Sequence, residues 1–163
     1  MIQKSVFAAL GVAAIVSAAF WYVRDSGEQS LDAALGAELA TLVRPAVEEK
    51  MSMDSAPNGS GARRMACAVR PFGTDPVSVD AIAEVETVYV WALCETPATE
   101  RSGVSLPIVV HLTPAVGIEV PTDADYDTGR AYDLFPERLH GFVDGGLPDG
   151  LEAVLEERIR ELS

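Results

Sequence analysis

The chain has 163 residues and carries 25 acidic against 12 basic side chains, for a formal net charge of −13 at pH 7. This acidity argues against nucleic acid as a partner and against docking on an anionic lipid surface. Scattered acids are typical of a solubilising surface, and a basic partner or bound metal cations are the functional alternative.

The longest uncharged stretch is the run of 19 residues from Ser5 to Val23. As a helix it is about 28 Å long, enough to cross the hydrocarbon core of a bilayer. We interpret residues 1–24 as a signal-anchor or transmembrane helix, because apolar residues continue through Phe20-Trp21-Tyr22-Val23. The alternative is a signal peptide cleaved after the small residues 17–19, which would give a secreted protein.

Lys4 precedes the apolar run without a nearby acid, so the short N-terminus is expected in the cytoplasm. Both interpretations then place the C-terminal part of the chain on the outer side of the membrane. Residues 25–30 are polar and predict a short stalk, and residues 31–163 have the length of a single extracytoplasmic domain.

The domain is predicted to begin with a helix. Ser30 is a suitable cap, and apolar residues recur at helical spacing from Leu31 to Val47. Pro45 is expected to kink or end this helix. Residues 51–63 are rich in turn formers and predict a loop.

The middle of the chain predicts an antiparallel sheet of three or four strands. Strands are expected at residues 65–70, 85–94, 104–113 and 117–120, with a long connection over residues 71–84. The strand at 85–94 is apolar on both faces, which is typical of a central strand covered on both sides. Pro107 places the first half of the third strand at an edge or a bulge.

The two cysteines, Cys67 and Cys94, both fall within predicted strands. If these strands pair antiparallel with Cys67 opposite Cys94, then Val69 lies opposite Ala92. An even pair in an exported protein predicts a disulfide, whereas two buried apolar thiols are the alternative. A metal site is not expected, since neither cysteine has a CxxC or histidine neighbour.

The C-terminal part predicts helices, which makes the fold class α+β. Thr122 and Asp125 have the spacing of a helix cap, and this helix is expected to reach about Phe135. A second short helix is expected over residues 136–143. The last one begins near residue 148, and its predicted apolar face is Leu151, Val154, Leu155, Ile159 and Leu162.

The alternating acids Asp123, Asp125 and Asp127 resemble the start of a calcium-binding loop. The sixth and twelfth positions of that loop are Thr128 and Leu134 instead of glycine and glutamate. Acids that favour a helix N-terminus explain the run without an ion. We therefore expect no metal site.

A nucleophilic hydrolase would need a serine or cysteine beside a histidine and an orienting acid. The two histidines, His111 and His140, lie in a predicted strand and a predicted helix and are interpreted as structural. Phosphate-loop and dinucleotide motifs do not occur, so no cofactor is expected, and no catalytic residue can be assigned. Tyr89 and Trp91 are expected in the core.

Three short motifs carry a resemblance: VYVWALC at 88–94, Ser102-Gly103 followed by PIVV at 107–110, and Tyr126, Tyr132 and Phe135-Pro136. They resemble small exported or membrane-anchored proteins of high-GC Gram-positive bacteria, most of them uncharacterised. The resemblance implies a location in the cell envelope and no known activity.

The sequence thus predicts a membrane-tethered extracytoplasmic binding or interaction module, anchored by residues 5–23, with an envelope protein as its possible partner. A small envelope hydrolase is the alternative. A structural helper that docks through its amphipathic helices, residues 30–49 and 149–162, is the third hypothesis.

Overall fold

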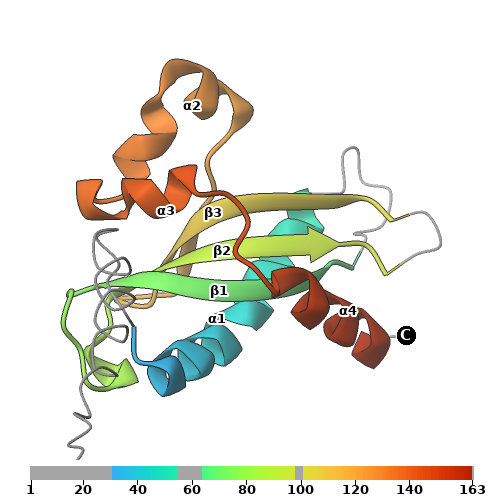
Figure 1. Ribbon diagram of the computed structural model, residues 1–163, viewed down its shortest axis with the longest axis horizontal. Coiled ribbons are helices and arrows are strands. Elements are labelled where there is room, and N and C mark those ends of the chain that lie inside the picture. Colours follow the sequence, from blue (N-terminus) through green and yellow to red (C-terminus); the bar gives the residue numbers. More distant parts are fainter. Residues whose placement is uncertain (1–30, 55–63, 98–100, 163) are drawn as a thin grey trace, which may run out of the picture.

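The computed structural model describes residues 31–54, 64–97 and 101–162. It confirms the α+β class: a helix, a four-stranded antiparallel sheet and C-terminal helices (Figure 1). The predicted membrane span and stalk, residues 1–30, lie outside the described residues. Among the helices that are described, none combines the length and apolarity needed to cross a membrane.

The sequence predicted that Pro45 kinks or ends the first helix. Helix α1 (Ala33–Asp54) continues through Pro45, so the proline does not end it. A mid-helix proline costs about 3 kcal/mol, because it removes a hydrogen bond and crowds the preceding turn. The apolar face continues past the proline, however, and its packing on the sheet offsets that cost. The residues of this face are Leu35, Leu39, Val43, Val47 and Met51.

Strands β1 (Ala66–Asp75) and β2 (Thr87–Glu95) pair antiparallel with Cys67 opposite Cys94 and Val69 opposite Ala92, which confirms the predicted register. The end of β1 predicted at Arg70 is wrong, because the strand continues to Asp75 after a register shift between Pro71 and Gly73. Since β1 is at the edge of the sheet, a proline there need not remove a ladder hydrogen bond.

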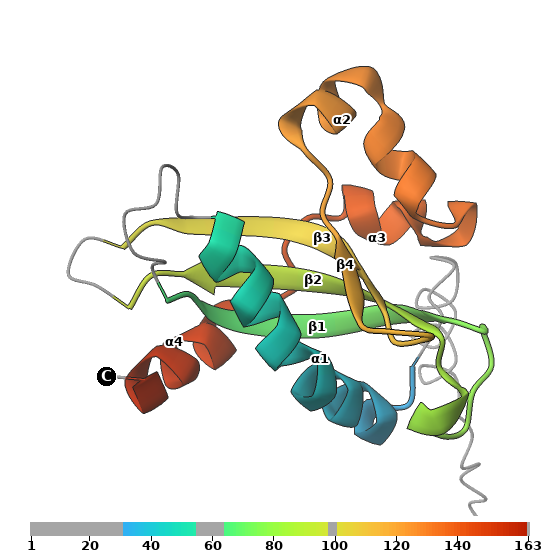
Figure 2. The ribbon, with the colours of Figure 1, turned by 180° about the vertical axis from the view of Figure 1, so that it is seen from behind.

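The central strand β2 is covered on both faces, as predicted. Its even-numbered residues from Val88 to Cys94 belong to the core against α1, which crosses one face of the sheet (Figure 2). Tyr89 and Trp91 point to the opposite face, where they pack with Phe135, Leu139 and the last helix. The sheet therefore separates two hydrophobic cores.

Strand β3 (Gly103–His111) pairs with β2 along its whole length, and β4 (Gly117–Glu119) pairs only with the last three residues of β3. Pro107 is opposite Trp91, in the part of β3 that β4 does not reach. This placement confirms the prediction that the proline-containing half of the strand is at an edge. A single 3₁₀ turn, η2 (Ile82–Glu84), lies in the connection between β1 and β2.

Thr122 caps the N-terminus of helix α2 (Asp123–Thr128), and the capping box between Thr122 and Asp125 is present as predicted. The helix ends earlier than predicted, because Gly129 adopts φ 74°, a left-handed conformation that terminates an α-helix. The chain continues as 3₁₀ turns η3 (Arg130–Leu134) and η4 (Glu137–Leu139) and the short helix α3 (His140–Asp144).

The last helix, α4 (Leu151–Leu162), lies on the face of the sheet opposite α1 (Figures 1 and 2). Its buried residues are Leu151, Leu155 and Ile159. Val154, predicted on the same apolar face, is instead 46% exposed. The edge strand β1 thus has a helix on each side, α1 on one face and α4 on the other, and this arrangement forms the candidate site.

Candidate functional site

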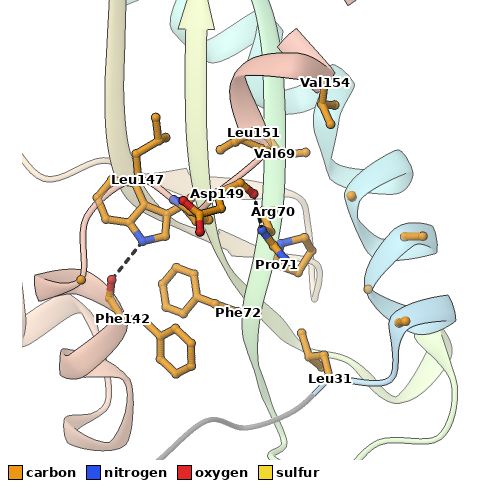
Figure 3. A pocket seen from close by; sticks show the side chains of 18 of the residues that line it. Leu31, Val69, Arg70, Pro71, Phe72, Phe142, Leu147, Asp149, Leu151 and Val154 are labelled. Atoms are coloured by element: carbon orange, nitrogen blue, oxygen red, sulfur yellow. Dashed lines mark hydrogen bonds between the residues drawn. The ribbon is translucent and has the colours of Figure 1, made fainter. Parts of the chain in front are cut away.

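A groove of about 870 Å³ follows the outer edge of β1 (Figure 3). Its floor is the strand segment from Val69 to Phe72. One wall is the first half of α1, and the other is the connection from α3 to α4 with the start of α4. Three segments that are far apart in the sequence therefore meet at this place.

The wall formed by α1 consists mainly of small residues. Ala33, Gly36, Ala37 and Ala40 line the groove, and a Cβ atom built on Gly36 would meet no atom within 4 Å. The opposite wall contains Leu147, Leu151 and Val154. The groove exists because small side chains on α1 stop short of the strand edge.

Aromatic side chains support the groove from below. The rings of Phe72 and Phe142 stack with centroids 5.5 Å apart, and the Trp91 indole Nε1–H donates to the Phe142 carbonyl at 3.0 Å (Figure 3). Tyr89 and Trp91 are each 6% exposed, which confirms that both are core residues. This rigid support holds the α3–α4 connection against the sheet.

The charged residues of the groove are Asp32, Arg70 and Asp149. The Asp32 carboxylate accepts hydrogen bonds from the backbone N–H groups of Ala34 and Leu35, at 2.9 and 3.2 Å, and so caps α1. The Arg70 guanidinium donates to the Asp149 carbonyl at 2.8 Å. These contacts make the charged groups of Asp32 and Arg70 parts of the framework.

Beyond one end of the groove, an ion pair connects the two flanking helices across β1. The Arg158 guanidinium donates from Nε and Nη2 to the two oxygens of Glu48, both at 2.8 Å. Glu48 Oε1 also accepts the backbone N–H of Cys67 at 3.2 Å. We call the three residues Glu48, Arg158 and Cys67 the clasp.

Burial raises the pKa of Glu48, but the hydrogen bonds from Arg158 and from Cys67 N–H, together with the charges of Arg158 and Arg44, outweigh that effect. The pKa of Glu48 therefore lies below its ordinary value. The same contacts, with a further hydrogen bond to Glu161, raise the pKa of the Arg158 guanidinium. Both groups are charged at neutral pH.

The Sγ atoms of Cys67 and Cys94 are 2.07 Å apart, the separation of a disulfide. The pair lies on the α1 side of the sheet, where Cys67 belongs to the clasp, and both side chains are fully buried. The two cysteines therefore cross-link β1 and β2 at the end of the edge that the clasp covers.

A second cavity, of about 600 Å³, lies between the end of α1, β4 and α2. Its polar lining includes Asp125 and Arg130, which are 3.4 Å apart. The Asp125 carboxylate accepts the backbone N–H of Thr122 at 2.9 Å and its hydroxyl at 2.6 Å. These contacts confirm that this acid caps the helix, and Asp123 and Asp127 beside it are exposed.

His111 lies between a hydroxyl and a carboxylate. Its Nδ1 is 3.1 Å from Thr87 Oγ1, and its Nε2 is 3.0 Å from Glu119 Oε1. A hydrolase uses these residue types, but Thr87 is only 9% exposed, and of the three only Glu119 lines one of the two cavities, the second. The two contacts tie β2, β3 and β4 together.

His140 is also part of the framework. Its Nε2 is 3.0 Å from the Phe135 carbonyl, and its ring contacts the edge of the Tyr132 ring. The Tyr132 hydroxyl donates to Asp144. Within the described part of the chain, no three histidine, cysteine or acidic residues gather as metal ligands would.

Comparisons of this chain with models of protein families, with curated proteins and with solved structures find no match. The candidate site therefore rests on the geometry of the groove. Sequence reasoning did not find it, although two signals were present: small residues at helical spacing in α1, and four glycines with Pro148 between residues 141 and 150.

Proposed function

We propose that this chain is a membrane-tethered extracytoplasmic binding module, and that the groove along β1 receives its partner. The observation that carries the proposal is the groove itself, a strand edge left open between two packed helices. Recessed sites with a largely apolar lining and a few polar groups are the usual form of binding sites in proteins.

The lining of the groove favours binding over catalysis. Among the described residues that line it there is no histidine, cysteine, serine or threonine. Its charged groups, Asp32, Arg70 and Asp149, belong to residues that hold the backbone of the site through the contacts described above. A general base beside a nucleophile, the minimum for covalent hydrolysis, is not part of this lining.

The tether is supported by the uncharged run of residues 5–23. The seven residues 24–30 then lead to Leu31, which itself lines the groove. Seven residues span at most about 25 Å when extended. A groove held at this distance from the bilayer favours a partner in the membrane or close to its outer surface.

Intact mass of the protein in membrane and culture fractions tests the tether. We expect the full-length mass in the membrane fraction, with two cysteines that react with a thiol label only after reduction. A mass that begins near Ala19 or Phe20, found in the medium, would make the protein secreted. Thiols that react without reduction would contradict export to an oxidising compartment.

Photo-cross-linking in cells tests the groove. A benzophenone amino acid at Ala37, on the groove wall, should give a discrete adduct, whereas the same probe at Ala34 should not, because Ala34 is exposed on α1 and outside the groove. Gly36→Trp should abolish the adduct by filling the groove, and Ala34→Trp should leave it. Equal adducts at both positions, or an adduct that survives Gly36→Trp, would refute the proposed site.

A further inference from the structure

The orientation of the backbone groups of β1 indicates what kind of partner the groove takes. The Cα atoms of Cys67 and Cys94 are 4.1 Å apart. In an antiparallel ladder, pairs this close are the non-hydrogen-bonded ones, with Cα atoms about 4.5 Å apart instead of about 5.5 Å. The N–H and C=O of Cys67 therefore point away from β2, and the bond from Cys67 N–H to Glu48 is consistent with this direction.

Val69 and Pro71 share this orientation, because they lie two and four residues further along β1 and before the register shift. Their backbone groups point outward, into the groove that both residues line. Val69 offers an N–H and a C=O, and Pro71 offers a C=O. No hydrogen bond to a described residue outside the sheet occupies the N–H of Val69.

Elsewhere, side chains cover the outer edge of β1. Ser52 Oγ accepts the N–H of Met65 at 2.9 Å, Glu48 accepts that of Cys67, and the Arg138 guanidinium donates to the Thr74 carbonyl at 3.0 Å. Native proteins block strand edges in this way, because a free edge is a template for another strand. The edge is blocked on both sides of the groove and open within it.

We propose that β1 accepts an extended, positively charged peptide segment of a partner protein as an additional strand. This inference rests on the proposed function and specifies its ligand. The open segment, Val69 to Phe72, is four residues of strand, about 13 Å at about 3.3 Å each, so it can pair with a stretch of similar length. Main-chain hydrogen bonds to Val69 and Pro71 supply the affinity, as in other cases of strand addition.

The walls and the charge of the molecule define the peptide further. Alternate side chains of an added strand point to opposite faces of the sheet, here toward the small residues of α1 and toward Leu151 and Val154 of α4. Short apolar side chains fit this space. The lining holds two acids, Asp32 and Asp149, against one base, Arg70, whose guanidinium is bound to the Asp149 carbonyl, and the chain as a whole carries a net charge of −13. This balance of charge attracts a positively charged segment.

Two other occupants fit less well. A second copy of the chain would bring its own β1 with α1 and α4 on its two faces, and these helices would meet those of the first copy before the recessed edges could pair. The chain's own residues 24–30 carry Arg24 against Asp25 and Glu28, so their charge has the same sign as that of the domain.

The test uses the full-length protein in detergent micelles and a synthetic peptide, Lys-Lys-Val-Ala-Val-Lys-Lys. The readout is hydrogen exchange of the Val69 amide, followed by NMR. We expect the peptide to slow this exchange at least tenfold. The same peptide with its three central amides N-methylated should bind at least tenfold more weakly and leave the Val69 exchange unchanged.

Two protein variants complete the experiment. Val69→Pro removes the outward N–H without touching the bonds to β2, and it should weaken peptide binding at least tenfold. Because this change also removes a buried side chain, Gly36→Trp is tested beside it and should block the peptide, whereas Ala34→Trp should bind like wild type.

Several outcomes would overturn the inference while the proposed function stands. These are equal binding of the parent and N-methylated peptides, or no peptide binding although Gly36→Trp abolishes the cross-link at Ala37. Equal binding of a peptide with glutamates in place of the lysines would refute the charge preference. Without peptide, Val69 protection that rises with protein concentration would identify a second copy as occupant, and strong concentration-independent protection that the peptide does not increase would show that the chain itself covers this edge.

Discussion

The two halves of the outer edge of β1 differ, although the same strand and the same helix α1 form both. In the first half, Ser52 and Glu48 of α1 bind the N–H groups of Met65 and Cys67, and Arg158 binds Glu48 from the other side. In the second half, α1 presents Gly36 and small alanines, and a groove remains. We call these the closed half and the open half.

This difference shows that a helix packed beside a strand edge does not by itself block the backbone groups of that edge. Both halves lie between α1 and α4, but only in the closed half does a side chain of α1 bind the backbone of β1. An open edge promotes association with other chains, so it is normally blocked. A gap confined to one groove, with blocked edge on both sides, is therefore the part of the surface most suited to a partner strand.

The largest expected effect concerns the covalent link in the closed half. Replacing both cysteines, Cys67→Ala with Cys94→Ala, should lower the free energy of unfolding by about 3.5 kcal/mol, the loop-closure value for the 27-residue separation. Urea unfolding of the variant and of the wild type, each with and without reductant, measures this. Wild-type stability that does not respond to reductant would show that no disulfide forms.

Breaking the clasp should have the next largest effect. Arg158→Ala leaves the Glu48 carboxylate, whose side chain is 13% exposed, without its cation, and should cost about 3 kcal/mol. The matched change in the open half is Arg70→Ala, which removes an exposed guanidinium and should cost about 0.5 kcal/mol or less. If urea unfolding gives similar losses of unfolding free energy for the two variants, the proposed difference between the closed and the open half is wrong.

The clasp should also make the closed half sensitive to acid. The pKa of Glu48 is lower in the folded protein than its ordinary value, so its contribution is complete above that ordinary value and is lost as the pH falls through the folded pKa. The difference in unfolding free energy between wild type and Glu48→Gln should therefore become smaller from pH 6 toward pH 3. A gap that is constant over this range, measured by urea unfolding at each pH, would contradict the assignment.

The smallest effect is expected in the open half. Gly36 lies within α1, and an added Cβ would meet no atom within 4 Å, so Gly36→Ala should stabilise the protein by about 0.5 to 1 kcal/mol. Gly73→Ala is the contrasting variant. Its added Cβ would lie 2.7 Å from Leu139 Cδ1, so this substitution should destabilise the protein. Thermal unfolding compares the two. Loss of stability in Gly36→Ala would mean that the groove is filled in solution.

Much of the fold could be predicted because its signals are local. The apolar residues on both faces of β2 predicted two covered faces, and the cysteine positions predicted the register with β1. The spacing of Thr122 and Asp125 predicted a capping box, which the structure contains. Each of these depends on a few neighbouring residues or on the strict two-residue period of a strand.

The errors occurred where packing overrides a local signal. Pro45 was expected to kink or end a helix and Pro71 to follow the end of a strand, yet α1 and β1 continue through them. Pro45 is exposed on a helix whose other face is buried, and Pro71 lies on an edge strand, where a missing N–H costs no bond to β2. Neither circumstance is visible in the residues adjacent to the proline.

The sequence alone determined the elements, the strand register and the acidic character of this protein, because periodicity, capping and charge are properties of short segments. Tertiary structure decided which edge is open. Glu48 and Arg158 are 110 residues apart, and the walls of the groove come from α1 and from residues beyond 140. Contacts over such distances depend on how the helices pack on the sheet, so only the folded chain separates a closed half from an open one.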